Sequence, residues 1–115
     1  MAEYWNEDEV LVRMRGKKDR LKKLVGMFVG TLPSNVQELE GFITENDLEN
    51  ARISAHTIKG AASNLSGKQL MESMAACEKA CFDEDLELAK SLLPNCMDQS
   101  EKLTQSLKHY LSSLE

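Results

Sequence analysis

Two residues near the middle of the chain have types and spacing suited to phosphoryl chemistry. His56 and Lys59 lie within one turn of each other if the segment around them is helical. An imidazole exposed to water is a ready nucleophile near neutral pH. A lysine one turn away can place a compact positive charge beside any anion that the imidazole acquires. The pair therefore predicts a histidine, His56, that carries a phosphoryl group, with Lys59 stabilising its charge.

Gly60 follows directly, one turn beyond His56, where a strong helix former would be expected. Glycine inside a helix costs roughly 1 kcal/mol relative to alanine. That cost is understandable if another molecule must come close to the backbone at this point. A close contact between helices of the same chain would also favour glycine, but Gly60 lies far from the apolar side of the helix. We therefore expect a partner protein to approach here.

An apolar stripe sets the orientation of this helix. Its members recur at spacings of three and four residues, as in a helical bundle: Leu48, Ala51, Ala55, Ile58, Ala62 and Leu65. At about 100° per residue, His56 projects some 130° from the centre of the stripe and should face water. On the same outward side lies Ile53, an apolar residue next to the nucleophile. The residues expected to bind the partner are Ile53, Thr57, Ser63 and Asn64.

The run His56-Thr57-Ile58-Lys59-Gly60 resembles the H-x-x-K-G signature of histidine-containing phosphotransfer (HPt) domains, which act in multistep two-component phosphorelays. The helical pattern on both sides also fits that family. One departure is that the family usually has glycine ten residues after the histidine, whereas this chain has Ser66 there and Gly67 next. This difference concerns the end of the helix rather than the histidine.

The resemblance implies a function and a partner. HPt domains pass a phosphoryl group between their histidine and the aspartate of a response-regulator receiver domain. The receiver would supply the aspartate and Mg²⁺, so we expect no cofactor bound by this chain and no ATP-dependent kinase activity of its own. The lead-in to the first helix favours the C-terminal domain of a hybrid sensor kinase over a free-standing protein. A helical adaptor bundle that binds a partner without chemistry is the alternative.

The remaining sequence predicts an all-α fold, an antiparallel up-down four-helix bundle with a short additional N-terminal helix, as one domain over residues 1–115. A second helix is expected to place Leu21, Leu24, Val25, Phe28, Leu32, Val36, Leu39 and Ile43 in the core. A third apolar stripe comprises Leu70, Met74, Cys77 and Cys81. The last comprises Leu88, Leu92, Cys96, Leu103, Leu107, Tyr110 and Leu114. Pro33 and Pro94 interrupt two of these helices; the phase across Pro33 favours a kinked continuous helix over two separate ones.

The spacing of Cys77 and Cys81 invites a metal site with His56 or Cys96. Structural zinc takes four cysteine or histidine ligands in a tetrahedral array. The cysteines lie on the apolar stripe, whereas His56 points outward, so we expect core packing and no metal. His109 lacks a lysine–glycine pair and should be an ordinary surface histidine.

Charge, apolar runs and cysteine content argue against several other classes of protein. The net charge of −5 argues against a nucleic-acid binder. No apolar run approaches the roughly 20 residues needed to cross a membrane, and no signal peptide opens the chain. Three cysteines, an odd number, are typical of reduced thiols. We expect a cytoplasmic monomer without membrane contact.

Overall fold

The chain was analysed as a computed structural model, which describes residues 4–114. Within these residues the chain forms five helices: α1 spans Glu7–Arg13, α2 Lys18–Thr44, α3 Leu48–Asn64, α4 Lys68–Phe82 and α5 Leu86–Ser113. Asn6, Asp47 and Asp85 cap α1, α3 and α5, because the side chain of each accepts a hydrogen bond from a backbone N–H in the first turn. The described residues are therefore helical apart from short connections.

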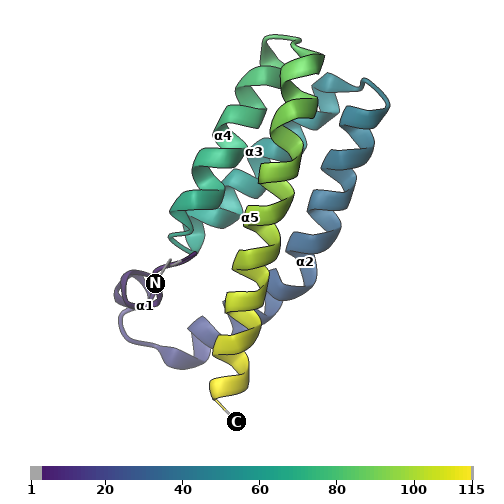
Figure 1. Cartoon of the computed structure of the whole chain (residues 1–115). Helices are drawn as coiled ribbons and strands as arrows, with labels where there is room; N and C mark the ends of the chain where they lie inside the picture. Colours follow the sequence, from purple (N-terminus) through teal and green to yellow (C-terminus); the bar gives the residue numbers. More distant parts are fainter. Residues whose placement is uncertain (1–3, 115) are drawn as a thin grey trace.

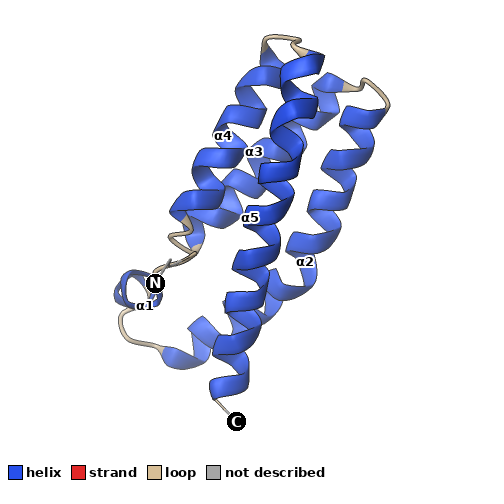
Figure 2. Cartoon of the chain, viewed as in Figure 1, coloured by secondary structure: helices blue, strands red, loops and turns tan. Residues whose placement is uncertain are grey.

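The four long helices lie side by side as a bundle, with α1 folded against one end (Figures 1 and 2). Around the bundle, α2 packs on α3, α3 on α4, α4 on α5, and α5 on α2. The four long helices are joined by turns of three residues, which force neighbours to run antiparallel. The predicted all-α bundle with a short N-terminal helix is confirmed.

The core is formed by the stripes that the sequence predicted, except for two residues that are exposed. Four other predicted core residues are partly buried and pack against it: Leu24, Leu48, Leu92 and Tyr110. Ala51, Ala55, Ile58 and Ala62 of α3 are fully buried. Leu88 and Leu114 were expected in the core but are about half exposed. Successive spacings of four residues drift around a helix, so a stripe running through Leu88 and Leu92 leaves the core face. Ala89 is buried in place of Leu88, and Leu114 is the C-cap beyond the last turn of α5.

Both prolines lie inside continuous helices. Pro33 is exposed on α2 and Pro94 is exposed on α5, so each ring and each missing N–H faces solvent. Leu32 before Pro33 and Val36 and Leu39 after it are all buried, which shows that the core stripe keeps its phase across the proline. Within residues 4–114, no helix has both the length and the apolar character that crossing a membrane requires.

The backbone conformation and packing at the end of α3 explain why the chain has serine at position 66 and glycine at position 67. Ser66 is in the left-handed region (φ 52°), where glycine is usual, and Gly67 N–H donates to the carbonyl of Ala62 at 2.8 Å. A Cβ on Gly67 would lie 3.1 Å from the carbonyl oxygen of Tyr4 and 3.3 Å from Leu103. Glycine is therefore required at position 67 by packing, while Ser66 adopts the strained conformation.

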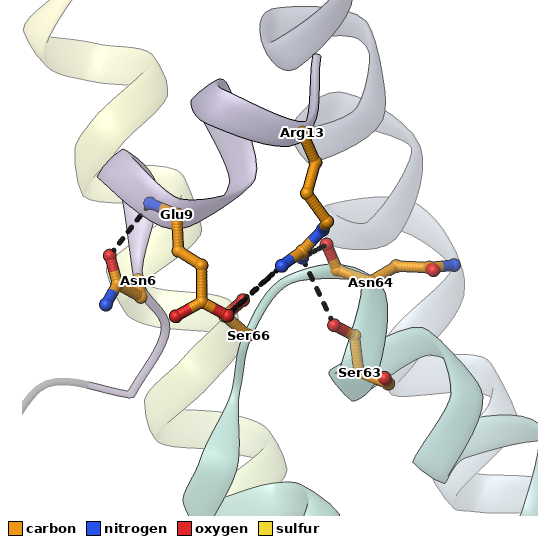
Figure 3. Close-up of polar contacts among 6 residues, drawn as sticks. All are labelled: Asn6, Glu9, Arg13, Ser63, Asn64 and Ser66. Carbon is orange, nitrogen blue, oxygen red and sulfur yellow. Dashed lines mark hydrogen bonds and ion pairs between the residues drawn. The ribbon is translucent and has the colours of Figure 1, made fainter. Parts of the chain in front are cut away.

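The side chain of Ser66 joins α1 to the end of α3 (Figure 3). Its hydroxyl donates to Glu9 at 2.7 Å and accepts from Arg13 at 3.0 Å. The Arg13 guanidinium also donates to the carbonyl oxygens of Ser63 (3.3 Å) and Asn64 (2.8 Å). These carbonyls belong to the last turn of α3, where the usual partner four residues later is missing; that of Ser63 also accepts the backbone N–H of Ser66 at 3.0 Å. Arg13 thus caps the helix that carries His56 from outside.

We expect Arg13→Met to lower the free energy of unfolding by about 1 kcal/mol, because hydrogen bonds to a charged group are lost at a half-exposed site. Urea denaturation measures the loss, and hydrogen exchange should show faster opening of α1. Arg20→Met, at an exposed position on α2, is the matched control and should change little. Equal losses for the two variants would contradict a capping role for Arg13.

Candidate functional site

The structure places His56 on the outer face of α3. Its side chain is 66% exposed, as the helical phase predicted. Ile53 lies one turn earlier and is 50% exposed, and Thr57 and Gly60 are also exposed. Thr57 donates its hydroxyl to the carbonyl of Ile53 at 3.1 Å, so its side chain lies along the helix. The predicted outward side of α3 is therefore a solvent-facing surface.

A glutamate from the neighbouring helix connects the two charged candidates. Oε2 of Glu78, on α4, lies 2.9 Å from Nδ1 of His56, and Oε1 lies 2.6 Å from Nζ of Lys59. Glu78 is mostly buried and Lys59 is about one-third exposed. The carboxylate thus binds His56 with one oxygen and Lys59 with the other. It holds both side chains of α3 close to α4.

This contact determines which imidazole nitrogen is free. An ionised carboxylate only accepts hydrogen bonds, so the hydrogen of a neutral His56 must be on Nδ1. The lone pair is then on Nε2. Nδ1 is occupied by Glu78, which leaves Nε2 as the nucleophilic atom of the exposed ring.

Glu78 stays ionised because of its partners. The hydrogen bond from Lys59 is the main cause that lowers the pKa of its carboxyl group; the hydrogen bond from His56 adds to it, and partial burial opposes it. A carboxyl whose pKa is lowered on folding stabilises the native state above its ordinary pKa. That contribution is lost as the pH falls through the lowered value. The bridge between His56 and Lys59 therefore persists through the neutral range.

Gly60 leaves open space beside the histidine. A Cβ added there would have no heavy atom of residues 4–114 within 4 Å apart from its chain neighbours and its own helix backbone, so packing within the described residues does not require the glycine. Ser63 and Asn64 are exposed about two turns beyond His56. Their carbonyls bind Arg13, so α1 adjoins this end of the face. The outer face of α3 hence runs from apolar Ile53, past His56 and an open notch, to polar residues beside α1.

Glu78 was not among the residues that the sequence predicted for the site. The sequence indicated an imidazole, a nearby cation and a surface, whereas the structure adds a carboxylate. The available signal was an acidic residue on the flank of α4, directly after the core residue Cys77. That signal identifies Glu78 only once the pairing of α3 with α4 is known.

The other candidates are separate from this site. Cys77, Cys81 and Cys96 are free and buried, as predicted, and His109 is exposed on α5. Among residues 4–114, no group of three or more histidine, cysteine or acidic side chains is arranged to hold a metal ion.

Comparison with known proteins places this geometry in a family. The chain is 22% identical over 106 residues to the phosphorelay intermediate protein rdeA of Dictyostelium discoideum; the match covers 92% of the chain but only 42% of that protein. The fold is similar to histidine-containing phosphotransfer protein B from Pseudomonas aeruginosa (TM-score 0.88, 18% identity, 98% of each chain). It is also similar to the HPT domain of a sensor hybrid histidine kinase from Shewanella (TM-score 0.84, 19% identity, covering 96% of this chain and 95% of that one). The Hpt domain model matches residues 23–115, which include the whole of the histidine-bearing helix α3, the whole of α4 and α5 and most of α2, and the chain therefore belongs to the Hpt domain family.

Proposed function

We propose that the chain is a cytoplasmic phosphorelay intermediate in which Nε2 of His56 accepts a phosphoryl group from a receiver-domain aspartate and passes it to another. The observation that carries this proposal is an exposed imidazole whose Nδ1 is bound by Glu78, one turn from Lys59. The family supports it, because Hpt domains relay phosphate with receiver domains.

The transfer needs no nucleotide at this site. The Nε2 lone pair attacks the phosphorus of the aspartyl phosphate, the N–P bond forms, and the P–O bond to the aspartate breaks with release of its carboxylate. The ring, which keeps the hydrogen on Nδ1, then carries positive charge. Glu78 lies 2.9 Å from that nitrogen and stabilises the charge, as a preorganised group should. Return of the phosphoryl group to a second aspartate reverses these steps.

Phosphoryl transfer depends mainly on positioning and on neutralising the oxygens. Lys59 is held beside His56 before the phosphoryl group arrives, and it is the cation of this chain closest in sequence to the histidine. We assign the Mg²⁺ and the remaining catalytic groups to the receiver domain. The chain itself would then act as a monomeric carrier with no bound cofactor.

The receiver would dock on the outer face of α3. Ile53 offers apolar contact, the open space at Gly60 permits close approach, and Thr57, Ser63 and Asn64 supply polar rim contacts. Relay contacts must form and separate, so the interface should be small, below about 1,200 Å² of total buried area.

The test is incubation of the purified chain with a receiver domain carrying a labelled aspartyl phosphate. The proposal predicts that label moves to this chain and onward to a second receiver that has not been labelled. Binding of the receiver with no transfer of label would support a helical adaptor bundle and would contradict the proposal.

We expect Lys59→Ala to slow acceptance or shorten the lifetime of the phosphohistidine. A partly exposed contact between an ammonium and a phosphoryl group is worth about 1 kcal/mol, which corresponds to a factor of about five. The rate is measured by quenched-flow transfer from the labelled receiver. Lys90→Ala, at an exposed position on α5, is the control; a Lys59 variant that matched it would show Lys59 to be an ordinary surface lysine.

Replacing Glu78 tests the positioning of the imidazole. Glu78→Ala should reduce the rate about fivefold, since it removes a hydrogen bond worth about 1 kcal/mol that fixes the hydrogen on Nδ1. Glu78→Gln keeps an acceptor and should recover part of the rate. Glu72→Ala removes an exposed carboxylate from the same helix and should have no effect. Nitrogen NMR of His56 should show a mixture of tautomers in Glu78→Ala; an unchanged tautomer would refute the positioning role.

A further inference from the structure

Three buried thiols lie together between α4 and α5, away from the face that carries His56. Cys77 and Cys81 are on α4 and Cys96 is on α5, and none of them forms a disulfide in this structure. The Cys77 and Cys96 thiols are close enough for each to shift the pKa of the other. The function proposed above makes no use of these thiols.

The position of Cys96 against α4 follows from one hydrogen bond. Its Sγ donates to the carbonyl oxygen of Ser73 at 3.3 Å. In an α-helix that same carbonyl accepts the backbone N–H of Cys77, four residues later. The sulfur of Cys96 therefore lies beside the turn of α4 from which Cys77 projects.

An open groove between α4 and α5 lies beside the turn of α4 that contains Ser73. It has a volume of about 320 Å³ and is lined by residues of α4 and α5 that include Ser73, Asn95 and Gln99. Asn95 donates to the Ser73 hydroxyl at 3.1 Å, and the buried Oε1 of Gln99 has no hydrogen-bond partner among residues 4–114. A small polar molecule in this groove therefore lies next to Ser73, whose carbonyl oxygen accepts from Cys96, while the Cys96 side chain itself is 1% exposed.

We propose that Cys77 and Cys96 are a dithiol site that a hydroperoxide converts into a disulfide linking α4 to α5. The Cys96 thiolate attacks the peroxide oxygen, the O–O bond breaks, and a sulfenic acid and hydroxide form. The Cys77 sulfur then attacks the sulfenic sulfur, the S–S bond forms, and the second hydroxide leaves. The two thiol protons convert both hydroxides into water. With hydrogen peroxide as the hydroperoxide, two thiols therefore give one disulfide and two water molecules.

The order of attack follows from the contact between the thiols. The interaction between the two thiols lowers the pKa of Cys96 and raises that of Cys77. Cys96 is thus the first to become a thiolate, and the thiolate is the species that reacts with peroxide. Burial raises the pKa of Cys81 to about 12. This raised pKa does not by itself set Cys81 apart, because the pKa of Cys77 is raised as well; the choice between them follows from geometry.

Geometry also selects the cross-helix pair over the pair on α4. Residues four apart on a helix have Cβ atoms about 5–6 Å apart, whereas a disulfide needs about 3.5–4.5 Å. Cys77 and Cys81 cannot meet this requirement without breaking a turn. Cys96 lies two residues after Pro94, which has no backbone N–H to donate within α5. The backbone of α5 near Cys96 can therefore shift to bring the two sulfur atoms together. Because Cys77 directly precedes Glu78, the disulfide forms in the helical turn that carries the carboxylate bound to His56.

The test uses the full reduced chain, folded, treated with hydrogen peroxide and then alkylated in denaturant. Trypsin places the three thiols on three different peptides, residues 69–79 for Cys77, 80–90 for Cys81 and 91–102 for Cys96, so every pairing can be distinguished by mass. We expect loss of two hydrogen atoms from the intact chain, a link between peptides 69–79 and 91–102, and an alkylated Cys81. Chain oxidised in denaturant should instead give mixed pairings.

A link between peptides 69–79 and 80–90 would overturn the proposal. So would three alkylated thiols, or thiols oxidised only to sulfinic or sulfonic acids, under conditions that oxidise the denatured chain. The Cys81→Ala variant should retain the link and Cys96→Ala should lose it. The mapping of the unsubstituted chain decides the question even if a variant folds poorly.

Discussion

His56→Gln should accept no phosphoryl group from a labelled receiver, while its circular dichroism and thermal midpoint stay close to those of the parent chain. The loss is complete because the glutamine amide has no nucleophilic lone pair equivalent to Nε2. The fold is kept because the side chain is 66% exposed, and such surface substitutions usually change stability by less than about 0.5 kcal/mol.

The matched control for this substitution is His109→Gln. The chain has two histidines, and His109 is exposed on α5, so the control removes the other imidazole. It should transfer at the parent rate. Acid-labile, alkali-stable label that remained in His56→Gln and disappeared in His109→Gln would move the phosphoacceptor to His109.

Gly60→Glu and Ile53→Asp should each reduce transfer strongly, by about tenfold or more, while hardly lowering the thermal midpoint. A side chain at position 60 fits the chain itself, because a Cβ there would have no heavy atom within 4 Å, but it fills the space that a receiver needs. Ile53→Asp places a charge on a 50% exposed apolar contact. A loss of about 1.4 kcal/mol of binding is enough for a tenfold effect.

Two controls separate docking from general surface effects. Gly41→Glu puts the same side chain on another exposed helical glycine, on α2. Met27→Asp puts the same charge on a residue of α2 that is also 50% exposed. Both should transfer at close to the parent rate. If Gly41→Glu slowed transfer as much as Gly60→Glu, close approach at the histidine would not be the reason for the glycine.

Much of the fold was accessible from the sequence, because it depends on local periodicity. The stripe of α3 has a single phase that buries Ala55 and Ile58 and exposes Ile53 and His56, and all four lie as predicted. The error at Leu88 arose at the start of α5, where both leucine and alanine could continue the stripe and tertiary packing selected Ala89.

The part of the site that the sequence did not reveal depends on how helices pair. Glu78 is 22 residues from His56, and nothing local distinguishes it from other glutamates of the chain. The contact between Cys77 and Cys96 has the same origin in the packing of α4 on α5. Ser66 departs visibly from the family pattern, but its hydrogen bonds to Glu9 and Arg13 depend on the position of α1.

The central claim, that Nε2 of His56 receives the phosphoryl group while Glu78 holds the hydrogen on Nδ1, can be tested directly by NMR of the chain labelled with ¹⁵N in its two histidines. Long-range proton–nitrogen spectra recorded before and after incubation with a phosphorylated receiver distinguish Nδ1 from Nε2 in each ring. We expect an Nδ1–H tautomer for His56 before incubation and a phosphorus coupling at its Nε2 after incubation, with the spectrum of His109 unchanged. A phosphorus coupling at Nδ1 of His56, or at either nitrogen of His109, would contradict it.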